Sequence, residues 1–207
     1  DFDTEAYTGI GHNRWATHGQ PCYRNSHPQT SLDERLAIVH NGVIENHNVL
    51  KSELQTKGFL FRSETDTEVL LNLIYDYLLF DTQDLYESVK LACERLEGAY
   101  SFVVIDKKLN NRHKLVIGKN GSNLMVGLSK EPGEFFVSSD SMVFDDRVDK
   151  IINVEDNVVG EIDSKCKLYS LNKKSYSSCN INKMHNQIFR SEEHTSELQS
   201  RFGISYA

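Results

Sequence analysis

Three short strings in the first third of the chain hold polar residues of the kinds that bind and activate small molecules. They read GHNRWATHG at residues 11–19, HNG at 40–42 and SETDTE at 63–68. Arg14 offers a planar guanidinium that suits bidentate binding of a carboxylate. An Arg beside a Trp is nevertheless also typical of a surface stack or an ion pair, so Arg14 alone does not predict a binding site.

The other two strings are also ambiguous when each is taken alone. Asn41-Gly42 is the strongest short signal for a type I′ hairpin turn, but the Asn amide and the unhindered Gly N–H also suit an oxyanion hole. Asp66 stands where a helix is expected to begin, so its carboxylate either complements the helix dipole or holds a substrate ammonium group. Together, an Arg for a carboxylate, an Asp for an ammonium group and paired oxyanion donors describe a site for an α-amino acid with a reactive side-chain carbonyl.

The order and form of these strings resemble those of a known family, the N-terminal-nucleophile (class II) glutamine amidotransferases. The strings that carry the resemblance are NRWATHG (13–19), HNGVIENH (40–47), SETDTEV (63–69), LEGAYSFVVID (96–106) and FFVSSD (135–140). The resemblance covers roughly Thr8 to Leu171. The full RWATHG and SETDTEV strings favour the glutamine–fructose-6-phosphate aminotransferase branch over the purine and asparagine branches.

The resemblance implies a role for each position that matches the family's motifs. Arg14 would bind the α-carboxylate of glutamine, and Asp66 would hold its α-ammonium group. Asn41 and Gly42 would form the oxyanion hole for the tetrahedral intermediate, Gly42 through its backbone N–H. The loop residues that would close over bound glutamine are Trp15, Thr17 and His18.

The family's nucleophile is an N-terminal Cys whose own α-amino group acts as the base. The family position of this Cys lies upstream of Asp1, so we expect the chain to be a fragment, truncated at both ends and inactive as written. Cys22 is neither N-terminal nor at the nucleophile's position, and we interpret it as an incidental small residue. His27 matches a family position, but no role follows for it from the sequence.

The function implied by the resemblance is the glutamine-hydrolysing half of a glutamine–fructose-6-phosphate transaminase (isomerizing). That half hydrolyses L-glutamine and supplies ammonia, which an isomerase half absent from this chain adds to fructose 6-phosphate to make glucosamine 6-phosphate. The family implies no cofactor, no metal and a homo-oligomeric parent protein. Three alternatives stay open: a non-catalytic fragment that binds glutamine or glutamate, the glutaminase domain of a purine- or asparagine-branch amidotransferase, and a fragment that does not fold stably.

The composition excludes several other classes of protein. Of 207 residues, 39% are hydrophobic and 26% charged, close to the globular norm and unlike a disordered chain. Lys and Arg number 23 against 30 Asp and Glu, a net charge of −7 without a basic block, so we expect no nucleic-acid partner. No apolar run approaches the roughly 18 residues of a membrane span, so we expect no membrane partner. The 4 Cys show no metal-ligand spacing, which favours free thiols in a cytoplasmic setting.

The elements expected around the three strings are segregated, helices from strands. Apolar spacing and capping residues predict helices at 46–57, 65–80 and 84–96, the second opening on a T-x-x-E capping box. β-branched and aromatic runs predict strands at 8–13, 36–40, 100–105, 114–118, 124–128, 134–137, 150–154, 157–162 and 167–171. This segregation predicts an α+β fold. The resemblance specifies it as an N-terminal-nucleophile hydrolase-like four-layer sandwich, two stacked mainly antiparallel sheets flanked by helices, incomplete at the N-terminus.

The chain divides into three expected segments. Residues 1–172 would form the type 2 glutamine amidotransferase domain without its N-terminal strands and nucleophile, and 173–189 a linker toward the absent isomerase half. The last segment, 190–207, opens with RSEEHTSELQS and closes with ISYA. It resembles the in-frame translation of a common sequencing adapter, so we expect this segment not to be native.

Overall fold

The computed structural model describes residues 8–13, 22–108, 114–178 and 203–204. Within these residues the helices are α1 (His47–Thr56), α2 (Asp66–Tyr77) and α3 (Leu85–Cys93), with short turns η1 (Tyr23–Asn25), η2 (Leu78–Thr82) and η3 (Ser141–Val143). Among the described helices, none is both long and apolar enough to span a membrane.

The strands form two antiparallel sheets, a larger one in the order β1-β2-β3-β4-β8-β9-β10 and a smaller one in the order β11-β6-β5-β7. The strands of the larger sheet are β1 (Gln29–Thr30), β2 (Leu36–Ile44), β3 (Gly98–Asp106), β4 (Leu115–Asn120), β8 (Val158–Ile162), β9 (Cys166–Ser170) and β10 (Ser175–Ser178). Those of the smaller sheet are β5 (Met125–Ser129), β6 (Phe135–Ser138), β7 (Val148–Asn153) and β11 (Gly203–Ile204).

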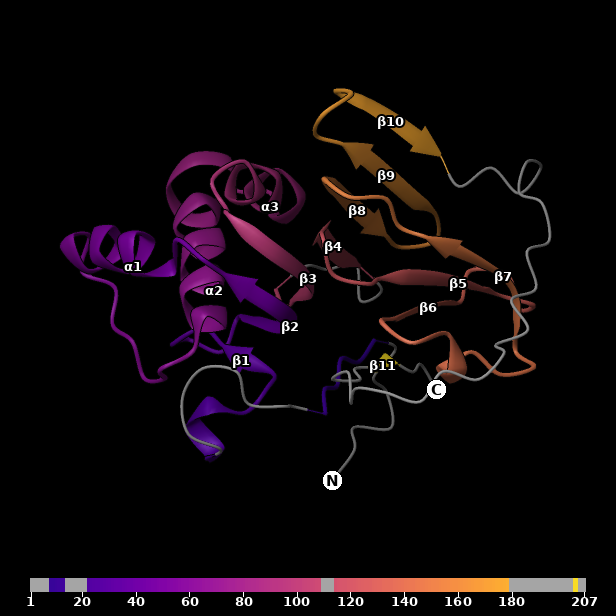
Figure 1. Ribbon diagram of the computed structural model, residues 1–207, viewed down its shortest axis with the longest axis horizontal. Helices are drawn as coiled ribbons and strands as arrows, with labels where there is room; N and C mark the ends of the chain where they lie inside the picture. Colours follow the sequence, from indigo (N-terminus) through magenta and orange to yellow (C-terminus); the bar gives the residue numbers. More distant parts are fainter. Residues whose placement is uncertain (1–7, 14–21, 109–113, 179–202, 205–207) are drawn as a thin grey trace.

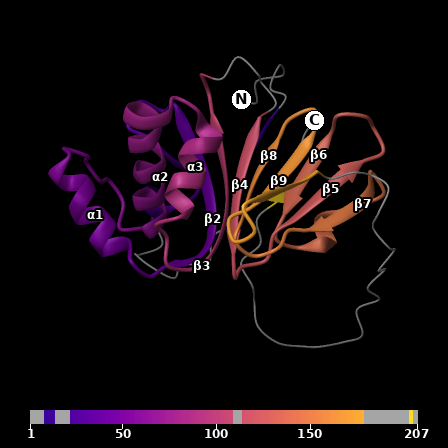
Figure 2. The same cartoon turned by 90° about the horizontal axis from the view of Figure 1, so that it is seen from above.

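The larger sheet is the middle layer of the molecule, with the helices on one face and the smaller sheet on the other (Figures 1 and 2). Successive side chains of β3 point to opposite faces of the larger sheet, so the strand contributes to the cores on both sides. Tyr100, Phe102 and Val104 belong to the core beneath the helices, whereas Val103 belongs to the core between the sheets. The α+β fold with two stacked antiparallel sheets is therefore confirmed. In the described part of the chain the helices lie against the larger sheet alone, which accounts for three of the four expected layers.

Helix α2 is buried over most of its circumference, as its apolar composition predicts, and its start is fixed by side chains. Thr65 Oγ1 accepts the Glu68 N–H at 3.3 Å, which is half of the predicted capping box. The Glu68 carboxylate accepts instead from the backbone N–H groups of Arg62 at 2.8 Å and Ser63 at 2.6 Å. Glu68 thus fixes the backbone of Arg62 and Ser63, just before the helix begins.

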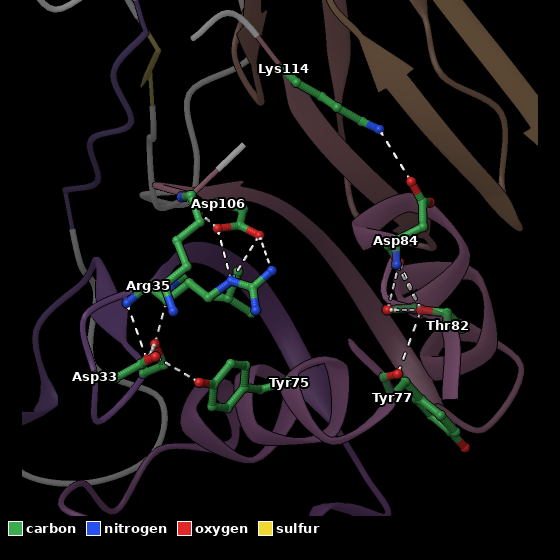
Figure 3. A network of polar contacts seen from close by, with 12 residues as sticks. Asp33, Arg35, Tyr75, Tyr77, Thr82, Asp84, Asp106 and Lys114 are labelled. Carbon is green, nitrogen blue, oxygen red and sulfur yellow. Dashed lines mark hydrogen bonds and ion pairs between the residues drawn. The ribbon is translucent and has the colours of Figure 1, made fainter. Parts of the chain in front are cut away.

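The ends of the other helices follow their capping residues. Helix α1 stops before Gly58, whose φ of +91° is a left-handed conformation that favours glycine. Helix α3 begins after Asp84, which accepts the Glu87 N–H at 2.9 Å and lies 3.7 Å from Lys114 on the sheet side (Figure 3). It ends at Cys93, earlier than predicted, because the chain then turns to enter β3.

Two expectations about strands need correction. Residues 8–13 contain no regular secondary structure, because among the described residues their backbone joins no ladder. The polar stretch after Asn172, which shows no strand pattern, contains β10, paired antiparallel with β9. The larger sheet therefore continues into the 173–189 range, and β11, within 190–207, pairs with β6.

A buried ion pair fastens the start of β2 to the end of β3 (Figure 3). Arg35 donates to Asp106 from Nε at 3.0 Å and from Nη2 at 2.8 Å, and the Asp106 side chain is 1% exposed. Hydrogen bonding to Asp106 raises the pKa of Arg35. Asp33 accepts from Tyr75 Oη of helix α2 at 2.7 Å, so the same cluster joins the helix layer to the sheet.

Candidate functional site

Asn41 and Gly42 lie within strand β2 and not in a turn. The antiparallel ladder continues through both residues, with Asn41 opposite Ser101 and Gly42 opposite Tyr100. The type I′ hairpin interpretation of Asn-Gly is therefore wrong, because pairing with β3 carries β2 past these residues to Ile44. The role of the two residues as oxyanion donors stays a prediction.

The backbone at Gly42 excludes any side chain. Its φ is +103°, and a Cβ atom placed there would lie 2.0 Å from the carbonyl oxygen of Ala99 and 2.8 Å from Ser122 Oγ. Glycine is required at this position because both the conformation and the close approach of β3 forbid a Cβ.

The loop before β5 that touches Gly42 is held by an ion pair. Asp156 Oδ1 accepts from the Gly121 N–H at 2.7 Å and from Lys119 Nζ at 2.5 Å. The bond from Lys119, together with that from Gly121, lowers the pKa of Asp156. This loop therefore backs the strand at the position where the Gly42 backbone is most constrained.

The N–H groups of β2 indicate which edge of the strand is open. Glu45 donates its N–H to the Glu97 carbonyl at 2.9 Å, toward β3, whereas Ile44 donates its N–H to Asp66 Oδ2 at 2.9 Å on the opposite edge. Because successive N–H groups of an antiparallel strand alternate between edges, the Gly42 N–H shares the edge of Ile44. Among the residues that the structure describes, strand β1 pairs with that edge only at residues 37–38, so the edge beyond them is open within this part of the chain.

Asp66 closes one end of this open edge. It is the first residue of α2 and is 4% exposed. Its bond to the Ile44 N–H ties the start of the helix to the strand. The carboxylate predicted to bind the α-ammonium group therefore lies at the same edge as the Gly42 N–H. The structure thus brings together three residues that the sequence singled out: Asn41, Gly42 and Asp66.

Three histidines that had no role in the sequence interpretation surround Asn41 and Thr67. His12 Nε2 lies 2.8 Å from Asn41 Oδ1. His27 Nε2 and His40 Nδ1 lie 3.1 and 2.9 Å from Thr67 Oγ1, and the rings of His12 and His27 are 4.5 Å apart. Their only sequence signal is position: His12 precedes NRWATHG and His40 opens HNG.

The environment of His40 favours the neutral form of its imidazole. Burial lowers its pKa; the Asp66 carboxylate acts in the opposite direction, and His12 lowers the pKa further. Within the described ranges, His40 Nε2 is buried without a hydrogen-bond partner, as a neutral ring tolerates more readily than a charged one. These imidazoles do not indicate a metal centre, since the described residues include no group of three or more potential ligands.

The segment that carries His27 is docked against the start of α2. Asn25 is fully buried and accepts the Glu64 N–H at 3.0 Å, while Arg24 Nη2 lies 2.9 Å from Glu64 Oε1. These bonds place His27 beside Thr67. Cys22, at the start of the segment, is exposed.

The remaining predicted ligands follow His12 directly in the sequence. Arg14 stands two residues after His12. The four predicted residues that lie outside the described part of the chain are Arg14, Trp15, Thr17 and His18. The described part of the site therefore offers hydrogen-bond donors and a buried carboxylate along one strand edge, a combination that suits an amino acid with a side-chain carbonyl.

A family model and curated relatives both match this chain to glutamine amidotransferases. A family model described as a glutamine amidotransferase domain matches residues 12–146. Glutamine–fructose-6-phosphate aminotransferase [isomerizing] from Bacteroides thetaiotaomicron is 41% identical over 160 residues, 77% of this chain and 25% of that protein. The protein of the same name from Tropheryma whipplei (strain Twist) is 46% identical over 148 residues, 72% and 23% of the two chains. This chain thus spans about a quarter of the length of the curated relatives it matches.

Solved structures show the same fold. Glutamine phosphoribosylpyrophosphate (PRPP) amidotransferase from B. subtilis, complexed with ADP and GMP, aligns with a TM-score of 0.59 and 25% identity over 82% of this chain and 34% of that one. A structure described as the allosteric regulatory enzyme of purine biosynthesis aligns with a TM-score of 0.56 and 24% identity, over 78% and 32% of the two chains. Both likenesses are to the N-terminal-nucleophile hydrolase type of fold.

Proposed function

Because this chain belongs to the glutamine amidotransferase domain family, we propose that it is the glutamine-hydrolysing part of a glutamine–fructose-6-phosphate aminotransferase. The observation that carries the proposal is the open edge of β2. There the Gly42 N–H, in a backbone that admits no side chain, shares an edge with the buried carboxylate of Asp66. An N–H and a carboxylate on one edge suit the two polar ends of glutamine.

The proposed chemistry is acyl transfer from the side-chain amide of glutamine. A nucleophile adds to the amide carbonyl, and the resulting oxyanion receives hydrogen bonds from Asn41 Nδ2 and the Gly42 N–H. Asp66 holds the α-ammonium group and Arg14 the α-carboxylate. Collapse of the intermediate releases ammonia, and water then releases glutamate. In this family the nucleophile is an N-terminal Cys thiol activated by its own amine, and the proposal needs such a thiol at this edge in the whole protein.

The residues after Arg14 would shield this reaction from water. We propose that Trp15, Thr17 and His18 cover bound glutamine, so that the ammonia released is not lost to solvent. Nothing in this step requires a cofactor or a metal.

The acceptor is proposed from the names of the relatives. The proteins at 41–46% identity are named glutamine–fructose-6-phosphate aminotransferase, whereas the PRPP amidotransferase is 25% identical. This difference favours fructose 6-phosphate as the acceptor of ammonia and glucosamine 6-phosphate as the product. The family resemblance alone is the basis for proposing that the whole protein is a homo-oligomer.

Glutamine binding by the purified chain tests the proposal directly. Calorimetric titration with L-glutamine is expected to show saturable binding at millimolar ligand, and Arg14→Ala is expected to weaken it at least tenfold, roughly the 1.4 kcal/mol of one charge-assisted bond. Arg147→Ala is the matched control, because Arg147 is exposed and its guanidinium pairs with Asp145, two residues away. A folded chain that gives no heat with glutamine, or equal affinities for wild type and Arg14→Ala, would contradict the proposal.

Product analysis of the whole protein separates the alternatives. Incubation with glutamine and fructose 6-phosphate is expected to yield glutamate and glucosamine 6-phosphate. Glutamate without the amino sugar would point to another acceptor. Binding without either product would identify a glutamine-binding module.

A further inference from the structure

The orientation of the Asn41 carboxamide decides whether it can serve as an oxyanion donor. A carboxamide carries an NH₂ group that donates and an oxygen that only accepts. If the Asn41 amide were rotated by half a turn, its oxygen would face the developing negative charge and repel it. A site that relies on Asn41 therefore needs a second group that holds the amide in one orientation.

His12 is placed to do this. Its Nε2 lies 2.8 Å from Asn41 Oδ1, in a partly buried contact between residues 29 positions apart in the sequence. Because the amide oxygen has no proton to donate, His12 Nε2 must carry the hydrogen in this bond. With Oδ1 held by His12, the donor end of the amide, Nδ2, is directed away from the imidazole. Asn41 is 9% exposed, so water has little access to compete for Oδ1.

The ring of His12 is itself supported by the elements that carry Asp66. It packs against the ring of His27 with a centroid separation of 4.5 Å and an interplanar angle of 50°. His27 in turn bonds Thr67 Oγ1 at 3.1 Å, and Thr67 follows Asp66 in the first turn of α2. The start of one helix thus supports both the predicted ammonium ligand and, through two imidazoles, the amide of Asn41.

We propose that His12 is a positioning residue, which donates from Nε2 to Asn41 Oδ1 and so directs Asn41 Nδ2 at the side-chain carbonyl oxygen of bound glutamine. The proposal rests on the proposed function, because it assumes that glutamine is the ligand of this edge. It assigns His12 no contact with the substrate and no proton transfer. His12 acts only through the orientation of Asn41.

Two variants of similar size test the donor role. His12→Gln keeps an N–H donor at a comparable reach, whereas His12→Leu fills the space without one. L-glutamine is expected to bind His12→Leu about tenfold more weakly than wild type, the loss of roughly one buried hydrogen bond, and His12→Gln within about threefold of wild type. His47→Ala is the control, because His47 also bonds a β2 residue, but at the Ile44 carbonyl, 2.7 Å away. Equal affinities for wild type and His12→Leu, or equal losses in the Gln and Leu variants, would overturn the proposal.

A spectroscopic measurement on the wild-type chain covers the case in which the variants do not fold. Nitrogen NMR of ¹⁵N-histidine-labelled protein is expected to show His12 protonated at Nε2. Protonation at Nδ1 alone would overturn the proposal, since Nε2 would then have to accept from the amide and turn Nδ2 away from the ligand. Failure of the proposed function appears differently: the wild-type chain would not bind glutamine at all, whatever the state of His12.

Discussion

At the scale of single residues, Gly42 is the most constrained position of the candidate site. A positive φ is tolerable for a side chain when space is available, but at Gly42 the carbonyl of Ala99 and the hydroxyl of Ser122 occupy that space. The strand therefore meets β3 and the following loop without a gap. This tight backing keeps the Gly42 N–H directed at the open edge.

Replacing Gly42 by alanine is expected to destabilise the fold by at least about 2 kcal/mol, from the strain of the positive φ plus the clash. Urea denaturation monitored by circular dichroism measures this. Gly133→Ala is the matched control, because Gly133 has a φ of +87° and its Cβ would meet nothing within 4 Å; it is expected to cost only about 1 kcal/mol. Equal losses of stability in the two variants would show that close packing contributes nothing at Gly42.

Residue types alone were sufficient to single out Asn41, Gly42 and Asp66 but not the histidines around them. An Asn-Gly pair and an Asp at a helix start are local patterns, readable within a few residues. The bond between His12 and Asn41 joins positions 29 apart, and that between His27 and Thr67 joins positions 40 apart. No local spacing encodes such contacts, because they arise only when the segments that carry His12 and His27 pack against β2 and α2.

At the scale of elements, strand β2 is the platform of the site. It is paired over its whole length with β3, and it holds the start of α2 through the bond from Ile44 to Asp66. Periodicity and capping residues predicted α1, α2 and β3 well, because each of these signals is local. The length of β2 was underestimated, since its last residues are extended only by pairing with β3. The strand expected at 8–13 is absent for the converse reason: among the described residues this β-like run has no strand to pair with.

The ion pair of Arg35 and Asp106 is expected to determine how firmly β2 and β3 are joined at their far end. Arg35→Met leaves the Asp106 carboxylate, 1% exposed, without its partner, and is expected to cost about 3–5 kcal/mol of unfolding free energy. The double variant Arg35→Met/Asp106→Leu removes both charges and is expected to recover much of that loss. Chemical denaturation of the three proteins measures both effects. A loss below about 1 kcal/mol in Arg35→Met would mean that the pair behaves like a solvent-exposed one.

At the scale of the whole molecule, the stability of the fold is expected to fall with acid in two stages. Burial lowers the pKa of His40 from its usual 6.5. Below about pH 6.5 the unfolded chain therefore binds a proton at His40 more readily than the folded chain does. The contribution of His40 to the stability of the fold is therefore fully present above that pH, and it is lost as the pH falls toward the lower pKa of the folded state. Carboxylates such as Asp156, whose pKa is lowered from 3.8 by Lys119, contribute stability that is lost only below about pH 4.

The His40→Gln variant separates these two stages, because it removes the first titration and leaves the second. Urea unfolding between about pH 5 and 8 is expected to show a slope in the wild type of up to roughly 1.4 kcal/mol per pH unit from this one group, and a shallower slope in His40→Gln. Below about pH 4 the two proteins are expected to lose stability in parallel. Identical slopes above pH 5 would mean that His40 has the same pKa in the folded and the unfolded chain, which would contradict the prediction.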